Sequence, residues 1–301
     1  MRLFVSATAA LALLASAVFA QGPPGAKLSS APKVKSSLVE FEMMTWPEVK
    51  AALAAGKTTA LFYTGGTEQR GPQNVNGGHN LMAKATVKQI ALKLGNAIAM
   101  PVLPYTPNEA SAELPGTIGL TDDLLGAILE RISEQAIVTG FKNIILMGDH
   151  GGGQPKVYSA VARKLDEKYA SNGIHVYYCD EVYEKANNDF SNWLVAHGYP
   201  RSLHAGIPDT SEMLYLGGAT GWVRKEQIRE AVGDPVLDPG QHALDSQSAA
   251  NALPHRNNGI KGDARRSTAE LGKMVFDRKV EYAVKQIQEF LTTPQKTTAQ
   301  Y

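Results

Sequence analysis

The stretch Asn143-Ile-Ile-Leu-Met-Gly-Asp-His-Gly-Gly-Gly-Gln154 runs an apolar segment directly into a glycine-flanked histidine. Residues 143–147 have the composition of a buried parallel strand. Ligands of open α/β sheets bind in the crevice beyond the carboxyl ends of such strands. The sequence therefore predicts that His150 lies at the functional edge of a sheet, where the glycines let the backbone approach a ligand closely.

A second predicted strand, residues 58–63, leads into a similar segment, Thr64-Gly-Gly-Thr-Glu-Gln-Arg-Gly-Pro72. This segment contributes Glu68, and His79 follows eleven residues later. One carboxylate and two imidazoles form a ligand set suited to Zn²⁺ or another first-row divalent ion. The alternative is a glycine-rich turn with incidental polar residues, because a single histidine is more often a surface or hydrogen-bonded residue than a ligand.

Helical and strand patterns alternate along the rest of the chain. Helices are predicted from the capping box Thr45-Trp-Pro-Glu48 to Gly56, over 80–94, 121–138, 154–169 and 183–197, and from the capping box Ser267-Thr-Ala-Glu270 to about residue 291, with strands over 97–103 and 174–179. Such alternation predicts a single-domain α/β fold with a mostly parallel sheet and helices on both faces. Residues 233–262 are predicted to be irregular.

A third candidate segment reads His204-Ala-Gly-Ile-Pro-Asp-Thr-Ser-Glu212. Pro208 suits the start of a helix, and Asp209 would be favoured as an anion in its first turn. Simple helix capping would account for Asp209, but it would not account for a histidine flanked by small residues. We therefore treat His204 and Asp209 as candidates for chemistry.

The first twenty residues have the charged, apolar and small-residue regions of a secretory signal peptide, with cleavage predicted after Ala20. An uncleaved N-terminal anchor is the alternative. Residues 21–37 are predicted to be a flexible leader, 38–291 the folded domain and 292–301 a flexible tail. The expected location is periplasmic or secreted. The single cysteine, Cys179, permits no intramolecular disulfide and is expected to pack in the core.

Charge and motif content argue against several classes of function. Lys and Arg number 30 and Asp and Glu 29, without a basic stripe, so no nucleic-acid partner is expected. Beyond the first twenty residues no apolar run is long enough to span a membrane. The turn 148–153 lacks the Gly-Lys-Ser/Thr ending of a phosphate loop, and the chain lacks dinucleotide-binding and serine-hydrolase glycine motifs.

Five ordered motifs together resemble the creatininase family of amide and cyclic-amide hydrolases. They are Gly65-Gly-Thr-Glu-Gln-Arg-Gly-Pro72, Leu114-Pro-Gly-Thr-Ile118, His150-Gly-Gly152, His204-Ala-Gly-Ile-Pro-Asp-Thr-Ser211, and Gly259-Ile-Lys-Gly-Asp263 followed by Thr268-Ala-Glu270. The resemblance spans most of residues 38–291. It implies an α/β fold, a hexameric assembly and a centre of two divalent metals.

The chain departs from this family at several ligand positions. The family motif Glu-Gln-His-Gly-Pro-His is represented here with Arg70 and Gln73 in place of its two histidines, and His79 stands where a bridging Asp is expected. Gly152 stands where creatininase has a further Glu ligand. Because arginine cannot ligate and an imidazole does not bridge, the departures favour one ion over two.

The resemblance implies that Glu68, His79 and His150 hold one divalent metal, Zn²⁺ or else Mn or Fe. It further implies that His204 transfers protons and that Asp209 is a ligand or general base. The fixed fork of donors on Arg70, a departure from the family, suits a substrate carboxylate or an oxyanion. We expect a homo-oligomer that hydrolyses a C–N amide or cyclic-amide bond of a small molecule with metal-activated water. Two alternatives remain at this point: a small-ligand-binding protein with a degenerate metal site, and an accessory protein with a vestigial one.

Overall fold

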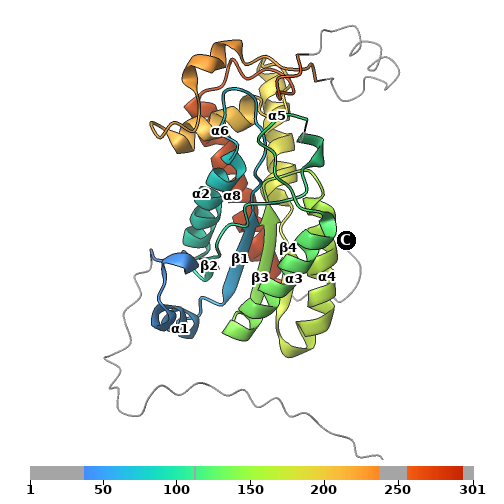
Figure 1. The fold of residues 1–301 in the computed structure, drawn as a ribbon. Coiled ribbons are helices and arrows are strands. Elements are labelled where there is room, and N and C mark those ends of the chain that lie inside the picture. Colours follow the sequence, from blue (N-terminus) through green and yellow to red (C-terminus); the bar gives the residue numbers. More distant parts are fainter. Residues whose placement is uncertain (1–36, 112, 237–255, 294–301) are drawn as a thin grey trace, which may run out of the picture.

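The computed structural model describes residues 37–111, 113–236 and 256–293, and a four-stranded parallel sheet forms its centre (Figure 1). The strands are β1 (Thr59–Thr64), β2 (Ala97–Ala99), β3 (Asn143–Gly148) and β4 (His175–Tyr178), and they lie in the order β2-β1-β3-β4. Neighbours β1 and β3 pair over their full length. Their carboxyl ends therefore lie side by side, which is where the sequence predicts the site.

Helices cover both faces of this sheet, as the sequence predicts (Figure 1). They are α1 (Trp46–Ala54), α2 (Gly78–Leu94), α3 (Asp122–Thr139), α4 (Gln154–Tyr169), α5 (Ala186–Ala196), α6 (Ile207–Gly217) and α8 (Ala269–Thr292). Shorter helical turns occupy Phe41–Met43, Glu109–Ser111, Ala170–Asn172, Glu181–Lys185 and Lys225–Glu230. Within the described ranges, no helix combines the length and apolarity that crossing a membrane requires.

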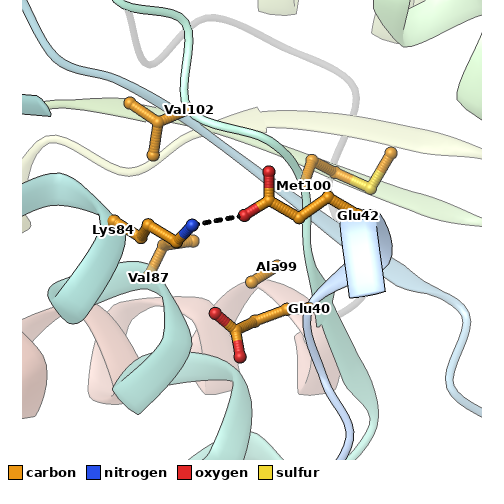
Figure 2. A pocket seen from close by; sticks show the side chains of 7 residues that line it. All are labelled: Glu40, Glu42, Lys84, Val87, Ala99, Met100 and Val102. Atoms are coloured by element: carbon orange, nitrogen blue, oxygen red, sulfur yellow. Dashed lines mark ion pairs between the residues drawn. The ribbon is translucent and has the colours of Figure 1, made fainter. Parts of the chain in front are cut away.

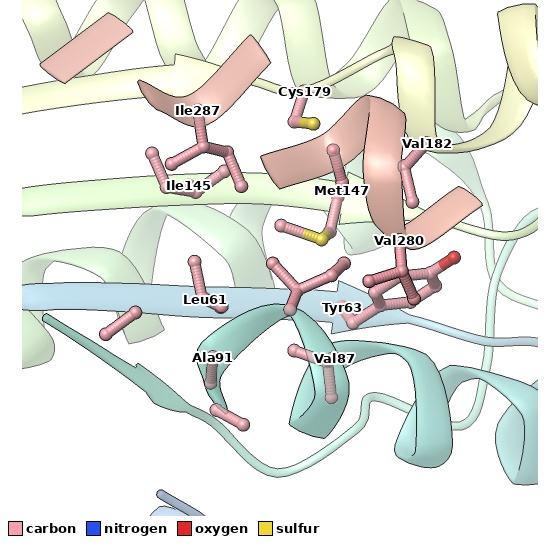
Figure 3. Packing of buried hydrophobic residues seen from close by; sticks show 14 of the residues in the cluster. Leu61, Tyr63, Val87, Ala91, Ile145, Met147, Cys179, Val182, Val280 and Ile287 are labelled. Atoms are coloured by element: carbon pink, nitrogen blue, oxygen red, sulfur yellow. The ribbon is translucent and has the colours of Figure 1, made fainter. Parts of the chain in front are cut away.

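Alternating strand residues divide the core into two layers. Leu61 and Tyr63 of β1 face α2 and α8 (Figure 3), whereas Ala60 and Phe62 face α3 and α4. Cys179 is buried in the first layer, as predicted. Full burial of an aliphatic or aromatic side chain contributes roughly 1.5–3 kcal/mol, so the two layers fix the strands beneath the site.

The sequence predicts the element types correctly but some of their ends incorrectly. The strand predicted over 97–103 is only Ala97–Ala99, because Pro101 has no N–H with which to extend the ladder. The second capping box is misplaced. Thr268, not Ser267, caps α8, and its hydroxyl accepts a hydrogen bond from the Leu271 amide. The predicted signal peptide and most of the predicted leader and tail lie outside the described residues.

A small pocket at the β2 edge of the sheet contributes nothing to the predicted site (Figure 2). Lys84 of α2 forms an ion pair with Glu42 at 2.6 Å there. The cavity measures about 10 Å³, which is the lower limit for a single water molecule. We interpret it as a packing gap where the segment around Glu42 contacts helix α2.

Candidate metal centre

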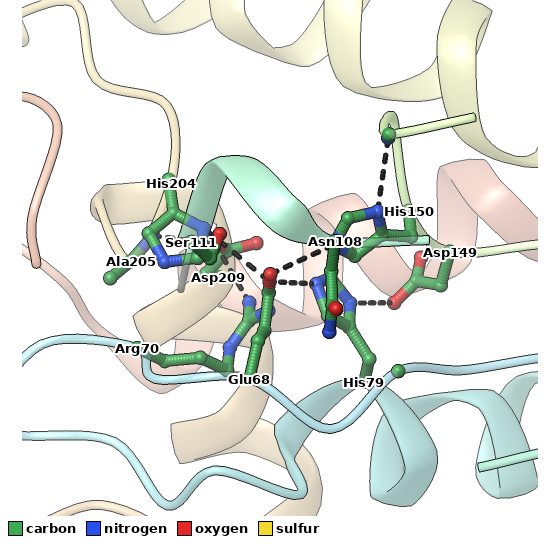
Figure 4. Close-up of polar contacts among 12 residues, drawn as sticks. Glu68, Arg70, His79, Asn108, Ser111, Asp149, His150, His204, Ala205 and Asp209 are labelled. Carbon is green, nitrogen blue, oxygen red and sulfur yellow. Dashed lines mark hydrogen bonds and ion pairs between the residues drawn. The ribbon is translucent and has the colours of Figure 1, made fainter. Parts of the chain in front are cut away.

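Glu68 is the central residue of the site (Figure 4). It lies just beyond the carboxyl end of β1 and is fully buried. Gly65 and Gly66 precede it and let the chain pass close to α2. A Cβ on Gly65 would collide with Asn80 at the start of that helix. Asn80 in turn accepts a hydrogen bond from the Gly66 amide at 2.9 Å. The glycines therefore bring the β1 turn and the first turn of α2 into contact.

His79 and His150 reach Glu68 from two other elements. His79, in the first turn of α2, places Nε2 2.9 Å from Oε1, and His150, after β3, places Nε2 2.8 Å from Oε2. One ligand atom from each of the three residues lies within 4.8 Å of the others. Burial alone would raise the pKa of Glu68, but the two histidines hold it far below its ordinary value through hydrogen bonds and charge.

This donor set fits a divalent ion of the zinc type, which takes imidazole nitrogen and carboxylate oxygen at about 2.0–2.2 Å. His79 also has the outer partner typical of metal-binding histidines, since its Nδ1 lies 3.2 Å from Asp149 Oδ2. Nδ1 of His150 accepts the Gly152 amide proton at 3.0 Å, so its Nε2 carries the ring proton. Ligation of a metal through Nε2 would require the ring proton to move to Nδ1, and the Gly152 amide would then have to turn away.

Arg70 is fully buried beside Glu68 (Figure 4). Its Nη1 donates to Glu68 Oε1 at 3.2 Å, and its Nη2 lies 2.7 Å from Asp209 Oδ2. Burial acts to lower the pKa of Arg70, and the two carboxylates outweigh it and raise the pKa. The guanidinium is therefore an internal cation that neutralises two acidic residues of the site.

His204 and Asp209 lie on the open side of the site. Their side chains are each 22% exposed, whereas that of Glu68 is 1% exposed. Nε2 of His204 donates to the Gln69 carbonyl at 2.8 Å, so Nδ1, which lies 3.4 Å from Glu68, presents a lone pair in the neutral ring. Burial lowers the pKa of His204, which favours that neutral form.

The backbone between these two residues is held in an unusual conformation. Ala205 has a φ of 56°, a left-handed conformation that few residues other than glycine adopt. Its amide donates to Asp209 Oδ2 at 2.8 Å, and its carbonyl accepts a hydrogen bond from Gln73 Nε2 at 2.7 Å. Asp209 thus fixes this turn as well as pairing with Arg70. All six residues that the sequence singled out meet in one connected network.

The sequence analysis missed three further buried charged groups. Lys279 of α8 donates to Asp149 at 2.6 Å and to Glu212 of α6 at 2.7 Å. Asp149 directly precedes His150. Lys279 lies on the buried stripe of α8 with Phe276 and Val280, and a lysine at such a position was the signal that could have revealed it.

These three groups differ in charge. Burial would raise the pKa of Asp149, but the Lys279 ammonium and the His79 hydrogen bond lower it. Burial raises the pKa of Glu212 to about 7, although Lys279 acts in the opposite direction. Lys279 keeps its proton, because the two carboxylates outweigh burial and raise its pKa. Lys279 and Asp149 therefore form the permanently charged pair.

Sequence comparison relates the chain to one family. The family model described as creatinine amidohydrolase matches residues 42–287. A creatinine amidohydrolase from Pseudomonas putida is 26% identical over 189 residues, which are 58% of this chain and 70% of that protein.

Solved structures support the same fold. A mutant creatininase superposes with a TM-score of 0.64 at 20% identity and covers 85% of this chain and 100% of its own. Another mutant, in a Zn–Zn form, has a TM-score of 0.64 at 21% identity, with 85% and 99% coverage. A creatininase in an Mn form has a TM-score of 0.62 at 20% identity and the same coverage. The likeness confirms the predicted α/β architecture.

Proposed function

Because the chain belongs to the creatininase family, we propose that it is a metal-dependent amidohydrolase acting on a C–N amide or cyclic-amide bond of a small molecule. The observation that carries the proposal is the convergence of Glu68, His79 and His150 from three separate segments of the chain. The donor set suits Zn²⁺, with Mn²⁺ or Fe²⁺ as the other candidates. A bound divalent ion supplies polarisation of the scissile carbonyl and a lowered pKa for its water.

The side chains on the open side suggest how a substrate would be handled. We assign proton transfer to His204, because its free Nδ1 faces the centre and its Nε2 is held by the Gln69 carbonyl. Asp209 carries a permanent negative charge: burial would raise its pKa, but the Arg70 guanidinium outweighs burial and lowers it. The burial of Arg70 leaves no surface for a substrate carboxylate, so we assign it charge compensation beside Glu68.

One ion per chain is the expected stoichiometry. Arg70 already provides a fixed positive charge next to Glu68, and a cation there opposes a second metal ion by direct repulsion. Elemental analysis of purified protein should give about one divalent ion per chain. Two tightly held ions per chain would contradict this arrangement.

Substitutions at the candidate ligands and at His204 test whether the ion is required for hydrolysis. His79→Ala and His150→Ala should each abolish both metal binding and hydrolysis in a screen of small amides and cyclic amides, because too few donors remain. His204→Ala should keep the ion and lose most of the hydrolysis. Full metal retention in His150→Ala would rule out the proposed centre.

The rival function is a small-ligand-binding protein with a degenerate site. It is favoured by the hydrogen bonds that already join Glu68 to both histidines and to Arg70. A protein that binds no divalent ion and hydrolyses no amide, but binds a small molecule, would support the rival.

Export and self-association remain proposals from the sequence. N-terminal mass analysis of the exported protein tests cleavage after Ala20, and light scattering tests for an assembly, a hexamer by resemblance to the family. An intact Met1 or a strict monomer at micromolar concentration would contradict them.

A further inference from the structure

Lys279 is a buried ammonium in the first layer of the core, with only 2% of its surface exposed. It projects from α8 among apolar neighbours, including Phe276 and Val280. A buried charge is costly unless it is paired and hydrogen-bonded. Lys279 meets this condition through two carboxylates, from the end of β3 and from α6, yet nothing in the proposed reaction requires it.

Asp149 connects this lysine to the candidate metal centre. Its Oδ1 accepts from Lys279 at 2.6 Å, and its Oδ2 lies 3.2 Å from Nδ1 of His79 (Figure 4). The opposite ring atom, Nε2, faces Glu68 at 2.9 Å. A continuous path of polar contacts therefore runs from α8 through the end of β3 to α2 and the β1 turn.

The direction of each hydrogen bond in this path is fixed by chemistry. An ammonium only donates, and an ionised carboxylate only accepts. Nδ1 of His79 must therefore carry a proton, and Nε2 is the ring atom left to serve as a ligand. The same carboxylate contact also sets the rotation of the imidazole.

We propose that Lys279 and Asp149 are positioning residues for His79, with Lys279 acting only through Asp149. The lysine fixes the orientation of Asp149, and Asp149 holds the His79 ring in the tautomer and rotation that a metal ligand needs. The inference deepens the proposed metal centre and rests on it. Helix α8, whose Lys279 follows His79 by 200 residues (279 − 79) in the chain, would thereby help to shape the ligand set.

Glu212 offers a matched control. It accepts a hydrogen bond from the same lysine at 2.7 Å, but among the described residues it forms no hydrogen bond or ion pair with Asp149 or with a candidate ligand, and its Oε1 has no hydrogen-bond partner there. If the two carboxylates only stabilised the buried lysine, changing Glu212 or Asp149 would have the same effect on metal binding. A positioning role would make only Asp149 matter to His79.

The first measurement is Zn²⁺ affinity by competition with a chelator. Asp149→Asn should weaken binding about 10–100-fold, the usual effect of removing an outer partner of a metal ligand. Lys279→Met should weaken it about 10-fold, and Glu212→Gln should leave it within about twofold on the same scale. Equal losses in Asp149→Asn and Glu212→Gln would overturn the proposal.

The second measurement is nitrogen NMR of metal-free protein labelled in histidine. The protonated Nδ1 of His79 should be retained in Glu212→Gln, shifted in Lys279→Met and altered most in Asp149→Asn. An unchanged His79 signal in Asp149→Asn would overturn the proposal. Because this measurement uses metal-free protein, failure of the wild type to bind Zn²⁺ would count against the proposed function and not against the positioning pair.

If Lys279→Met fails to fold, the double variant Asp149→Asn/Lys279→Met answers the same question. Lys279 acts through Asp149 in this proposal, so adding the second change to Asp149→Asn should cause no further loss of Zn²⁺ affinity. An additional loss of about 10-fold or more would show that Lys279 acts by another route.

Discussion

Gly78 decides whether Arg70 fits beneath the site. A Cβ on Gly78 would lie 3.0 Å from Arg70 Cδ and 2.8 Å from Met213 Sδ, whereas a Cβ on the adjacent Gly77 would meet nothing within 4 Å. Gly78→Ala should therefore reduce the free energy of unfolding by about 1–3 kcal/mol through overpacking. Gly77→Ala, as the control, should cost less than about 1 kcal/mol. Urea denaturation measures both, and equal stabilities would contradict the packing argument.

Among single residues, the sequence identifies those of the site that are marked by the neighbouring sequence. Glu68, His79 and His150 each stand in or near a glycine-rich segment after a predicted strand, and the structure brings them together. The link from Lys279 to Asp149 depends on how α8 packs against the end of β3, which no local pattern reveals. The sequence also could not predict that Arg70 is buried, because its burial depends on contacts with Gly78 and with Asp209, the latter distant in the chain.

At the scale of one element, the start of α8 rests on a single hydroxyl. Thr268 accepts the Leu271 amide at 3.2 Å, while the Ser267 hydroxyl is buried without a partner among the described residues. Thr268→Ala should cost about 1 kcal/mol of stability, as typical N-caps do. Ser267→Ala should be nearly neutral. Thermal or urea unfolding measures the stability of the two variants. A larger loss of stability in Ser267→Ala than in Thr268→Ala would instead support Ser267 as the N-cap, as the sequence predicts.

Helices and strands were predicted accurately where the apolar pattern was clear and glycine or proline residues marked the ends. The helix predicted over 154–169 is α4, Gln154–Tyr169, because a glycine run precedes it and an apolar stripe spans it. Strand β2 is shorter than predicted, since Pro101 has no N–H and interrupts the pairing with β1, which resumes only as an isolated bridge between Leu103 and Thr64. Composition alone therefore predicts type better than length.

At the scale of the whole molecule, α6, α8 and the sheet meet at a buried charge cluster whose balance depends on pH. Glu212 faces Lys279 from α8, Asp149 from the end of β3 and Asp209 from its own helix. Its pKa rises from 4.5 to about 7 on folding, mainly because it is buried. The folded protein thus binds this proton more tightly than the unfolded chain does, and the cost of ionising Glu212 appears as pH rises.

The sign of the resulting pH effect can be tested with one variant. Below about pH 4.5 Glu212 is protonated in both states and costs nothing, whereas above about pH 7 it is ionised in both and the full cost is present. Glu212→Gln removes that titration, so its stability relative to the wild type should increase from pH 5 to pH 8. Other groups titrate in both proteins and largely cancel in the difference. Urea midpoints of metal-free proteins at the two pH values provide the measurement. A constant difference would mean that Glu212 keeps an ordinary pKa, and a decreasing one would mean that ionised Glu212 stabilises Lys279 more than burial opposes it.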